Sequence, residues 1–345
     1  MKKMNVLSFV VALCMVLVFP LSAMAAPITL TFSDQNSDIS WGPVHATQPW
    51  VKQIEAATKG RIKIQIYPSQ TLAKGKQNWK AVKDGIADMS WNVMPYYTGL
   101  TPYADVIGLP GLPFSTAEEG SALLWKLFEK FPEVSGQFAD NKVLILHTSP
   151  VFMLLTSKKQ VKDLDGIKGM KVRSVGGNFT EVLKKLGAIP MMIPMPDCYI
   201  AMQKGTIDGM GAAWEPIPGY RLQEVTKYIT ENVPFGASYF SVVMNKNKWN
   251  SLPKDIQDAM MSVSGFEGSR NYGKNFFDSA VAPVKQMIKE KGLDIGVYSL
   301  TEEEKAKWIE VGVKPVWESW IQRMEKDGYT KAREVLNAAI KMAKE

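Results

Sequence analysis

The sequence predicts an α/β protein with two lobes and a cleft between them. Short apolar strand patterns alternate with amphipathic helical patterns along most of the chain, which is typical of α/β folds. The pattern A-x-x-x-G-x-x-D occurs twice, at 81–88 and at 201–208, and each copy ends a predicted helix and begins a predicted strand. Two further apolar stretches, 143–157 and 236–245, suit connections that cross between lobes. Two such crossings would form a hinge.

The first 25 residues predict an export signal. Lys2 and Lys3 precede an apolar core at 6–19, and Ala23-Met24-Ala25 has the small-residue pattern of a cleavage site. The apolar core is short for a membrane span, although an uncleaved anchor is the alternative. We therefore expect export across the inner membrane and a mature chain that begins at residue 26.

Composition argues against several classes of function. Without Lys2 and Lys3, 39 of the 41 basic residues remain against 34 acidic ones, a formal charge of +5 with both histidines neutral. This mild, dispersed charge does not favour a nucleic-acid surface. Cys198 is the one cysteine after the signal, so no intramolecular disulfide can form. The chain has no metal-ligand spacing, phosphate loop or catalytic motif, so we expect no cofactor and no metal, with an enzyme as a lesser alternative.

The first half of the mature chain reads as alternating strands and helices. The expected strands are 28–32, 62–66 and 86–91, and the expected helices are 45–59 and 76–83. A polar loop that contains Gln35 follows the first strand. Because α/β sheets place ligands at the carboxyl ends of their strands, Gln35 is a candidate contact, although an ordinary polar turn fits equally.

A strand–helix–strand unit around Arg173 is the centre of the functional interpretation. Residues 170–174 predict a strand, Asn178 a helix N-cap, and Gly187 the end of that helix. Arg173 is one of six arginines in the chain and lies on the strand. A charge there is costly unless it is paired, and a guanidinium can grip a carboxylate or a sulfonate with two parallel hydrogen bonds. The residues alone leave a structural ion pair equally open.

Each copy of the repeated pattern is followed by a tryptophan. If the two halves are equivalent, Trp91 and Trp214 approach one cleft from opposite sides; otherwise both belong to the core. Asn92, Tyr96 and Tyr239 are weaker candidates for polar contacts near the same cleft.

Several ordered motifs together resemble one family. Residues 163–173 are similar to its "dLkGlKiR" signature, residues 186–209 to its "lGa" and "Y.alq.G.vDg" pattern, and residues 249–253 to its "W..Lp". The family is that of the DctP-type solute-binding proteins of tripartite ATP-independent periplasmic (TRAP) transporters, and the resemblance covers nearly all of the mature chain. It implies a two-lobed periplasmic-binding-protein-like fold with a hinge, mixed sheets and a long helix, here 253–291, that spans both lobes.

The resemblance also implies a function and a role for Arg173. In that family the corresponding arginine binds the acidic group of the ligand. We therefore expect a periplasmic protein, with no nucleic-acid partner, that captures a small organic anion and delivers it to a membrane permease, and we expect a monomer. The binding protein of an ATP-driven importer is the alternative.

Departures from the family pattern narrow the ligand. The neighbourhood 150–154 lacks the second arginine of many dicarboxylate and acidic-sugar binders, and 211–213 lacks a frequent asparagine. One anion clamp with walls of Phe152, Met153 and Trp214 favours a monoanion over a dicarboxylate. Hydroxy acids, keto acids and small sulfonates such as isethionate or taurine remain open, and Met191 and Met192 are either pocket wall or core.

The expected division of the chain follows from the crossings. Residues 26–150 and 239–278 would form lobe I, and 151–238 and 279–300 lobe II. Residues 301–345 would form helices that pack on both lobes, beginning with a capping box at Thr301 and Glu304.

Overall fold

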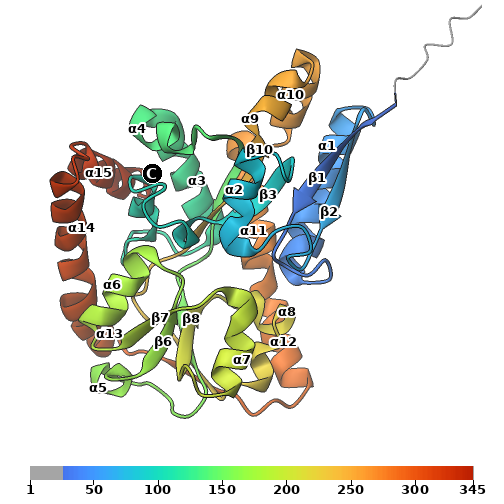
Figure 1. Ribbon diagram of the computed structural model, residues 1–345. Helices are drawn as coiled ribbons and strands as arrows, with labels where there is room; N and C mark the ends of the chain where they lie inside the picture. Colours follow the sequence, from blue (N-terminus) through green and yellow to red (C-terminus); the bar gives the residue numbers. More distant parts are fainter. Residues whose placement is uncertain (1–25, 345) are drawn as a thin grey trace, which may run out of the picture.

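The computed structural model describes residues 26–344, so the expected export signal lies outside the described residues. The chain forms two lobes, each built on a mixed sheet (Figure 1). The first sheet has the order β2-β1-β3-β10-β4. Its strands are β1 (Ile28–Ser33), β2 (Ile62–Tyr67), β3 (Met89–Val93), β4 (Asn141–Thr148) and β10 (Tyr239–Asn245). β1 runs parallel to β2 and β3, while β10 is antiparallel to β3 and β4.

The second sheet has the order β11-β9-β5-β8-β6-β7. Its strands are β5 (Met153–Thr156), β6 (Lys171–Ser174), β7 (Ile189–Met192), β8 (Gly209–Ala212), β9 (Tyr228–Glu231) and β11 (Gly296–Ser299). β6 is parallel to both neighbours, β7 and β8, whereas β5 is antiparallel to β8 and β9. Arg173 therefore lies on an interior strand of this sheet.

Two short strand-to-strand connections run between the lobes, as the apolar stretches predict. β4 and β5 belong to different sheets, and so do β9 and β10. The first stretch is two strands rather than one, because Pro150 has no N–H to offer a ladder. The two connections lie side by side: Ser149 N donates to Ser238 O at 2.9 Å and Phe152 N to Gly236 O at 3.3 Å. These paired links are the hinge of the two-lobed fold.

Helices cover both sheets. Those of the first half are α1 (Gln48–Ala57), α2 (Asn78–Lys83), α3 (Ala117–Lys130) and α4 (Pro132–Ser135). Those of the second sheet's segment are α5 (Leu164–Ile167), α6 (Gly177–Lys185), α7 (Cys198–Gln203) and α8 (Pro216–Gly219). Asn178 is not the cap of α6 as expected: the cap is Gly176, two residues earlier, and the Asn178 amide donates to Asp105 O at 2.8 Å.

The expected long helix at 253–291 is divided. After α9 (Lys246–Ser251) the run forms α10 (Lys254–Ser262), α11 (Gly265–Phe276) and α12 (Val281–Glu290). Gly265, with φ of +64°, separates the first two, because that backbone conformation cannot continue a right-handed helix. The run still reaches both lobes: α11 packs on α3 and β4, and Lys285 of α12 pairs with Glu231 of β9 at 2.8 Å.

The C-terminal helices are α13 (Glu302–Trp308), α14 (Lys314–Lys326) and α15 (Ala332–Met342). Thr301 caps α13 by accepting from Glu304 N at 3.2 Å. α14 packs on α6, whereas α15 packs on α3, so this segment contacts elements on both sides of the hinge (Figure 1). Among residues 26–344, no helix combines the length and apolar character needed to cross a bilayer.

Candidate functional site

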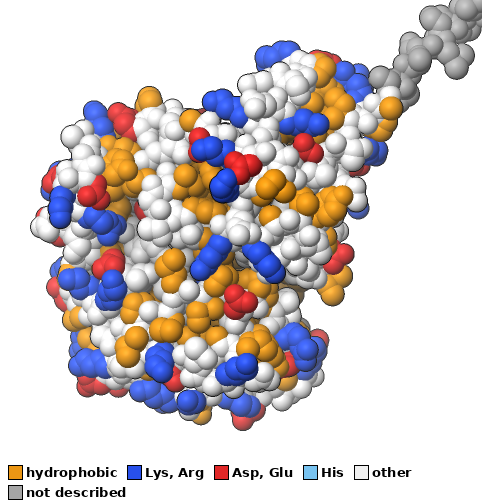
Figure 2. All heavy atoms as spheres, viewed as in Figure 1, with side chains coloured by type: hydrophobic (Ala, Val, Ile, Leu, Met, Phe, Trp, Pro, Cys, Tyr) orange, Lys and Arg blue, Asp and Glu red, His pale blue; other side chains and the backbone are white. Residues whose placement is uncertain are grey.

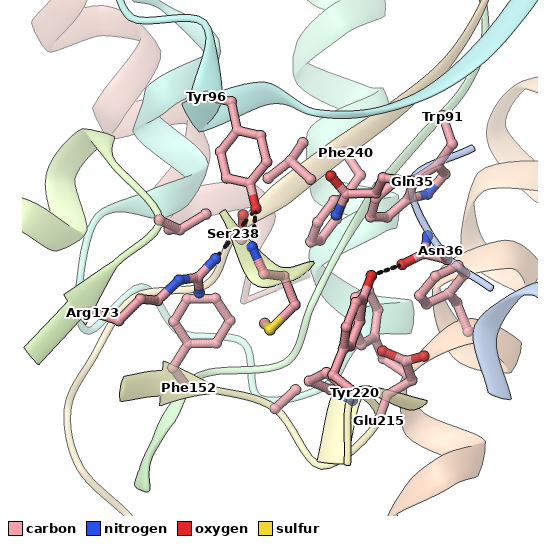
Figure 3. A pocket seen from close by; sticks show the side chains of 17 residues that line it. Gln35, Asn36, Trp91, Tyr96, Phe152, Arg173, Glu215, Tyr220, Ser238 and Phe240 are labelled. Atoms are coloured by element: carbon pink, nitrogen blue, oxygen red, sulfur yellow. Dashed lines mark hydrogen bonds between the residues drawn. The ribbon is translucent and has the colours of Figure 1, made fainter. Parts of the chain in front are cut away.

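A small cavity of about 40 Å³ lies between the two lobes. Both sheets contribute to its wall, which is largely aromatic (Figure 3). The lining residues are Gln35, Asn36, Trp91, Val93, Tyr96, Phe152, Arg173, Val175, Met195, Ala213, Glu215, Pro216, Tyr220, Ser238, Phe240, Phe276 and Phe277.

Arg173 is the basic group of this pocket. It is the third residue of β6 and only 1% exposed. Its Nε donates to Ile193 O at 2.9 Å and its Nη1 to Gly211 O at 3.3 Å, and both acceptors are backbone carbonyls. Its Nη2 donates to the Tyr96 hydroxyl at 3.4 Å. No carboxylate among residues 26–344 pairs with it.

The sequence left open a structural ion pair for Arg173, and the described part of the chain provides none. A buried guanidinium whose partners are all neutral is unfavourable. The three contacts also leave donors of its fork unused. An anionic group of a ligand is the partner that would complete this environment.

Tyr96 joins the two lobes at the guanidinium. It ends the 3₁₀ turn Met94–Tyr96, directly after β3 of the first sheet. Its hydroxyl accepts from Arg173 and, at 2.9 Å, from the backbone N–H of Met195, both on the second lobe. Burial raises the pKa of Tyr96, so the phenol stays protonated and keeps a proton to donate beside Arg173.

Trp91 anchors the aromatic wall. Its indole stacks on Phe276, with ring centroids 5.4 Å apart and planes 5° apart, and on Phe240 at 4.9 Å. Its Nε1 donates to His147 Nε2 at 2.9 Å. Burial lowers the pKa of His147 to about 3, which keeps that nitrogen unprotonated and able to accept. The indole is thus held in one orientation in the pocket wall.

A polar group lies at the end of the pocket opposite Arg173 (Figure 3). The Tyr220 hydroxyl donates to Asn36 Oδ1 at 2.7 Å, and the Asn36 amide donates to Asp34 Oδ1 at 2.8 Å. Glu215 Oε1 accepts from Gly42 N at 3.2 Å. Burial raises the pKa of Glu215 to about 8 and that of Asp34 to about 7, and the charge of Asp34 contributes to the shift of Glu215.

Four of the seven residues predicted for the site line this pocket. They are Gln35, Trp91, Tyr96 and Arg173. Gln35 follows β1 as the loop argument expected, and it is 4% exposed. Their proximity to a ligand remains a prediction, but their convergence on one pocket is a feature of the fold.

Trp214 does not line the pocket, which corrects the expected pairing of the two tryptophans. β8 ends at Ala212, so Trp214 follows the strand instead of lying in it. Its ring lies under Lys285 Nζ, 4.8 Å from the ring centroid. With Met153 it borders a different hollow, so of the three residues expected as pocket wall only Phe152 takes that place.

Asn92 and Tyr239 also point away from the pocket. Adjacent strand residues face opposite sides of a sheet, so the neighbours Trp91 and Phe240 line the pocket instead. The Asn92 amide donates to Ser90 O at 3.2 Å. The Tyr239 hydroxyl donates to Asp105 Oδ1. Met191 packs in the core of the second lobe, and Met192 is 47% exposed, so neither borders the pocket.

Sequence reasoning missed the polar end of the pocket. Asn36 stood in the loop singled out for Gln35, and Glu215 directly follows Trp214. Tyr220 and Ser238 carried no signal beyond lying near those elements. The available clue was position in the loops after β1 and β8, not residue type.

No group of three or more His, Cys, Asp or Glu side chains within the described range could hold a metal ion. The pocket lining contains one basic and one acidic residue, Arg173 and Glu215, at opposite ends (Figure 3). Such an arrangement can orient a ligand.

Comparison with known proteins identifies the class. Residues 40–323 match the family described as bacterial extracellular solute-binding protein, family 7 (DctP). The chain therefore belongs to that family, the solute-binding proteins of TRAP transporters, as its motifs predicted. Members are periplasmic proteins that bind small organic acids and work with membrane permease components, and they are binding proteins rather than enzymes.

Two solved structures and one sequence relative illustrate the range. A TRAP solute-binding protein from Rhodoferax ferrireducens, in complex with copurified benzoate, is 26% identical, with a TM-score of 0.86 over 92% of this chain and 97% of that one. A marine metagenome protein specific for aromatic acid ligands, with 3-hydroxybenzoate, is 26% identical, with a TM-score of 0.86 over 92% and 98%. The C4-dicarboxylate-binding periplasmic protein DctP of Rhodobacter capsulatus is 25% identical over 88% of this chain and 89% of its own. The two-lobed fold predicted from the sequence is confirmed, whereas the relatives differ in ligand.

Proposed function

We propose that this protein captures an aromatic monocarboxylate in the interlobe pocket and delivers it to a TRAP permease. Arg173 clamps the carboxylate, Tyr96 donates a further hydrogen bond, and Trp91 belongs to the aromatic wall that contacts the ring. Gln35 contributes a polar contact on the side of the first lobe.

The observation that carries the proposal is the buried, unpaired guanidinium of Arg173 in an aromatic pocket. It is 1% exposed and bonds only to neutral oxygens. An anion is the ligand group that gains most from this site, because it forms charge-assisted hydrogen bonds with donors that are already desolvated.

The wall favours an aromatic ring over a small aliphatic chain. Six aromatic side chains besides Tyr96 line the pocket: Trp91, Phe152, Tyr220, Phe240, Phe276 and Phe277. Offset and edge contacts with a planar ring add to the area that such a ligand buries. The binding of benzoate and 3-hydroxybenzoate by the two structural relatives supports the same chemistry.

A dicarboxylate is disfavoured by charge. Among the described residues, Arg173 is the only basic side chain that lines the pocket, and the far end carries Glu215. A second carboxylate would be buried without a cationic partner, which costs several kcal/mol. The monoanion preference expected from the missing second arginine thus gains an independent reason.

The test is a ligand panel followed by calorimetry. Thermal shift would compare benzoate and hydroxybenzoates with lactate, pyruvate, isethionate, taurine, malate and succinate. We expect the aromatic monocarboxylates to stabilise the protein most. A larger shift with any dicarboxylate would contradict the single-clamp site. A larger shift with isethionate or taurine would show that the ligand is a sulfonate and not a carboxylate.

We further propose that residues 1–25 are removed on export and that the mature protein is a periplasmic monomer. Mass spectrometry of the periplasmic fraction should give a chain that starts at Ala26. Sedimentation of the purified protein should give a single species with the mass of one chain.

A further inference from the structure

The polar end of the pocket is built, not incidental. Asn36, Glu215 and Tyr220 come from different loops of the two lobes, and their side chains meet opposite Arg173 (Figure 3). Asn36 and Glu215 are each 4% exposed. Buried polar atoms in an otherwise apolar wall are unfavourable unless they are satisfied.

Hydrogen-bonding capacity remains at this end. Asn36 uses Oδ1 for Tyr220 and one amide proton for Asp34, which leaves its second amide proton. Glu215 uses Oε1 for Gly42 N, and its Oε2 has no hydrogen-bond partner between residues 26 and 344. A ligand atom seated there can therefore find both a donor and an acceptor.

The electrostatic environment selects the charge of that ligand atom. Burial, with a smaller contribution from nearby Asp34, raises the pKa of Glu215 to about 8, which favours the protonated carboxyl at neutral pH. A neutral acid and an amide suit a neutral group that can both donate and accept. A second anion would face two carboxyl groups without a cation, and a cation would have to ionise a group that burial keeps neutral.

We infer that Asn36, Glu215 and Tyr220 form a subsite for an uncharged hydroxyl group on the ligand, remote from its carboxylate. The protein would thus select hydroxy-substituted aromatic acids over the unsubstituted acid. The inference rests on the proposed function, because it assumes that Arg173 holds the carboxylate and so fixes which end of the ring reaches Glu215.

Calorimetry with matched ligands tests the subsite. We would titrate benzoate, 2-, 3- and 4-hydroxybenzoate, isophthalate, terephthalate and 3-(aminomethyl)benzoate into the mature protein. We expect the 3- or the 4-hydroxy acid to bind about tenfold more tightly than benzoate, because one good hydrogen bond to a buried group increases affinity by about this factor. The 2-hydroxy acid, whose hydroxyl lies beside the carboxylate, should gain nothing.

Two variants separate the subsite from the fold. Glu215→Met keeps the side-chain length but has no carboxyl, so the ratio of hydroxybenzoate affinity to benzoate affinity should fall towards one. Glu215→Gln keeps a donor and an acceptor and should retain the advantage. Circular dichroism and thermal unfolding of each variant without ligand serve as the control for folding.

Each outcome distinguishes the subsite from the proposed function. If benzoate binds but no hydroxyl improves affinity, or if Glu215→Met leaves the advantage intact, the subsite is wrong and the aromatic-acid function stands. Tighter binding of a phthalate or of the aminomethyl acid would overturn the neutral-group assignment. If none of these acids binds wild-type protein, both the function and the subsite are wrong.

Discussion

The two copies of A-x-x-x-G-x-x-D, one in each lobe, have the same local structure. Each closes a helix, α2 or α7, and turns at a glycine with positive φ, +77° at Gly85 and +68° at Gly205. Each aspartate then accepts a backbone N–H from the neighbouring strand: Asp88 from Thr31 at 2.8 Å, and Asp208 from Lys171 at 3.0 Å. The repeat therefore marks the start of equivalent central strands.

The two copies differ at the third residue of the strand that follows. In β3 this residue is Trp91, whose indole lines the pocket. In β8 it is Gly211, whose carbonyl accepts from Arg173. A Cβ at Gly211 would lie 2.2 Å from the Phe179 ring, so that ring occupies the space where a side chain would be. Equivalent strands thus supply the aromatic wall in one lobe and support for the cation in the other, and Trp214 is not the counterpart of Trp91.

Replacing the two tryptophans in parallel should show the largest difference. Both are buried, so Trp91→Ala and Trp214→Ala should each reduce the free energy of unfolding by about 3–5 kcal/mol. Only Trp91→Ala should also weaken binding of an aromatic acid, by tenfold or more, because only Trp91 lines the pocket. Chemical denaturation gives the stabilities and calorimetry the affinities. Equal losses of affinity in both variants would show that Trp214 contributes to the site as much as Trp91 does.

Arg173 should dominate affinity on the side of the second copy. Arg173→Ala should cost about 2–5 kcal/mol of binding free energy, roughly 30-fold or more, because a charge-assisted clamp is lost. Arg173→Lys should restore only part, since an ammonium lacks the planar fork. Calorimetry at fixed pH measures both variants. Near-wild-type binding by the alanine variant would remove the guanidinium from the site.

Gly211→Ala tests whether the missing side chain matters. The added methyl meets the Phe179 ring, so we expect a loss of about 1–3 kcal/mol in stability from overpacking. Displacement of the Gly211 carbonyl should also weaken its bond to Arg173 and lower ligand affinity several-fold. Ala212→Gly, at the next position of the same strand, provides a control without overpacking. A Gly211→Ala protein with unchanged stability and affinity would show that the glycine is incidental.

The polar end of the pocket, at Glu215, predicts that the free energy of unfolding depends on pH. The pKa of Glu215 is raised from 4.5 to about 8, so the folded state holds a proton that the unfolded state has lost between these values. The contribution of Glu215 to the free energy of unfolding should therefore be complete below about pH 4.5. It should be lost as pH rises towards 8, by about 1–2 kcal/mol after allowance for structural relaxation around the charged group. Glu215→Gln should flatten this part of the curve. Asp34 and Asp105 titrate in the same direction, so the measurement is the difference between wild type and variant across pH.

The smallest effects should come from the two aspartates, where the copies agree. Asp88→Asn and Asp208→Asn each exchange a charged acceptor for a neutral one at a strand N–H, which should cost about 1 kcal/mol or less of unfolding free energy. The two losses should be similar. A loss confined to one variant would show that the shared pattern does not carry a shared role.

The order of elements and the family could be read from the sequence because periodicity, turn glycines and the motif around Arg173 are local signals. The side of the sheet that each side chain faces could not be read from the sequence. One position along a strand reverses a side chain, so Tyr239 was expected where Phe240 lies, and Asn92 beside Trp91. The break of the long helix at Gly265 depended on a backbone conformation that residue type allows but does not require. Glu215 was overlooked because it belongs to the site only through its proximity to Asn36, which comes from the opposite lobe.

Basic and acidic side chains are intermixed over the face shown in Figure 2, in agreement with the mild net charge of the mature sequence. The residues that we propose distinguish one ligand from another lie between the lobes.

The hydroxyl of Tyr96 also has a kinetic consequence. It holds Arg173 and Met195 N from across the cleft, so the anion clamp is complete only while the lobes are together. Residence time should then be set by how often the lobes part. In rapid-mixing experiments on tryptophan fluorescence, Tyr96→Phe should raise the dissociation rate far more than it changes the association rate. The side chain that helps to bind the ligand would thus also set the rate at which the ligand is released to the permease.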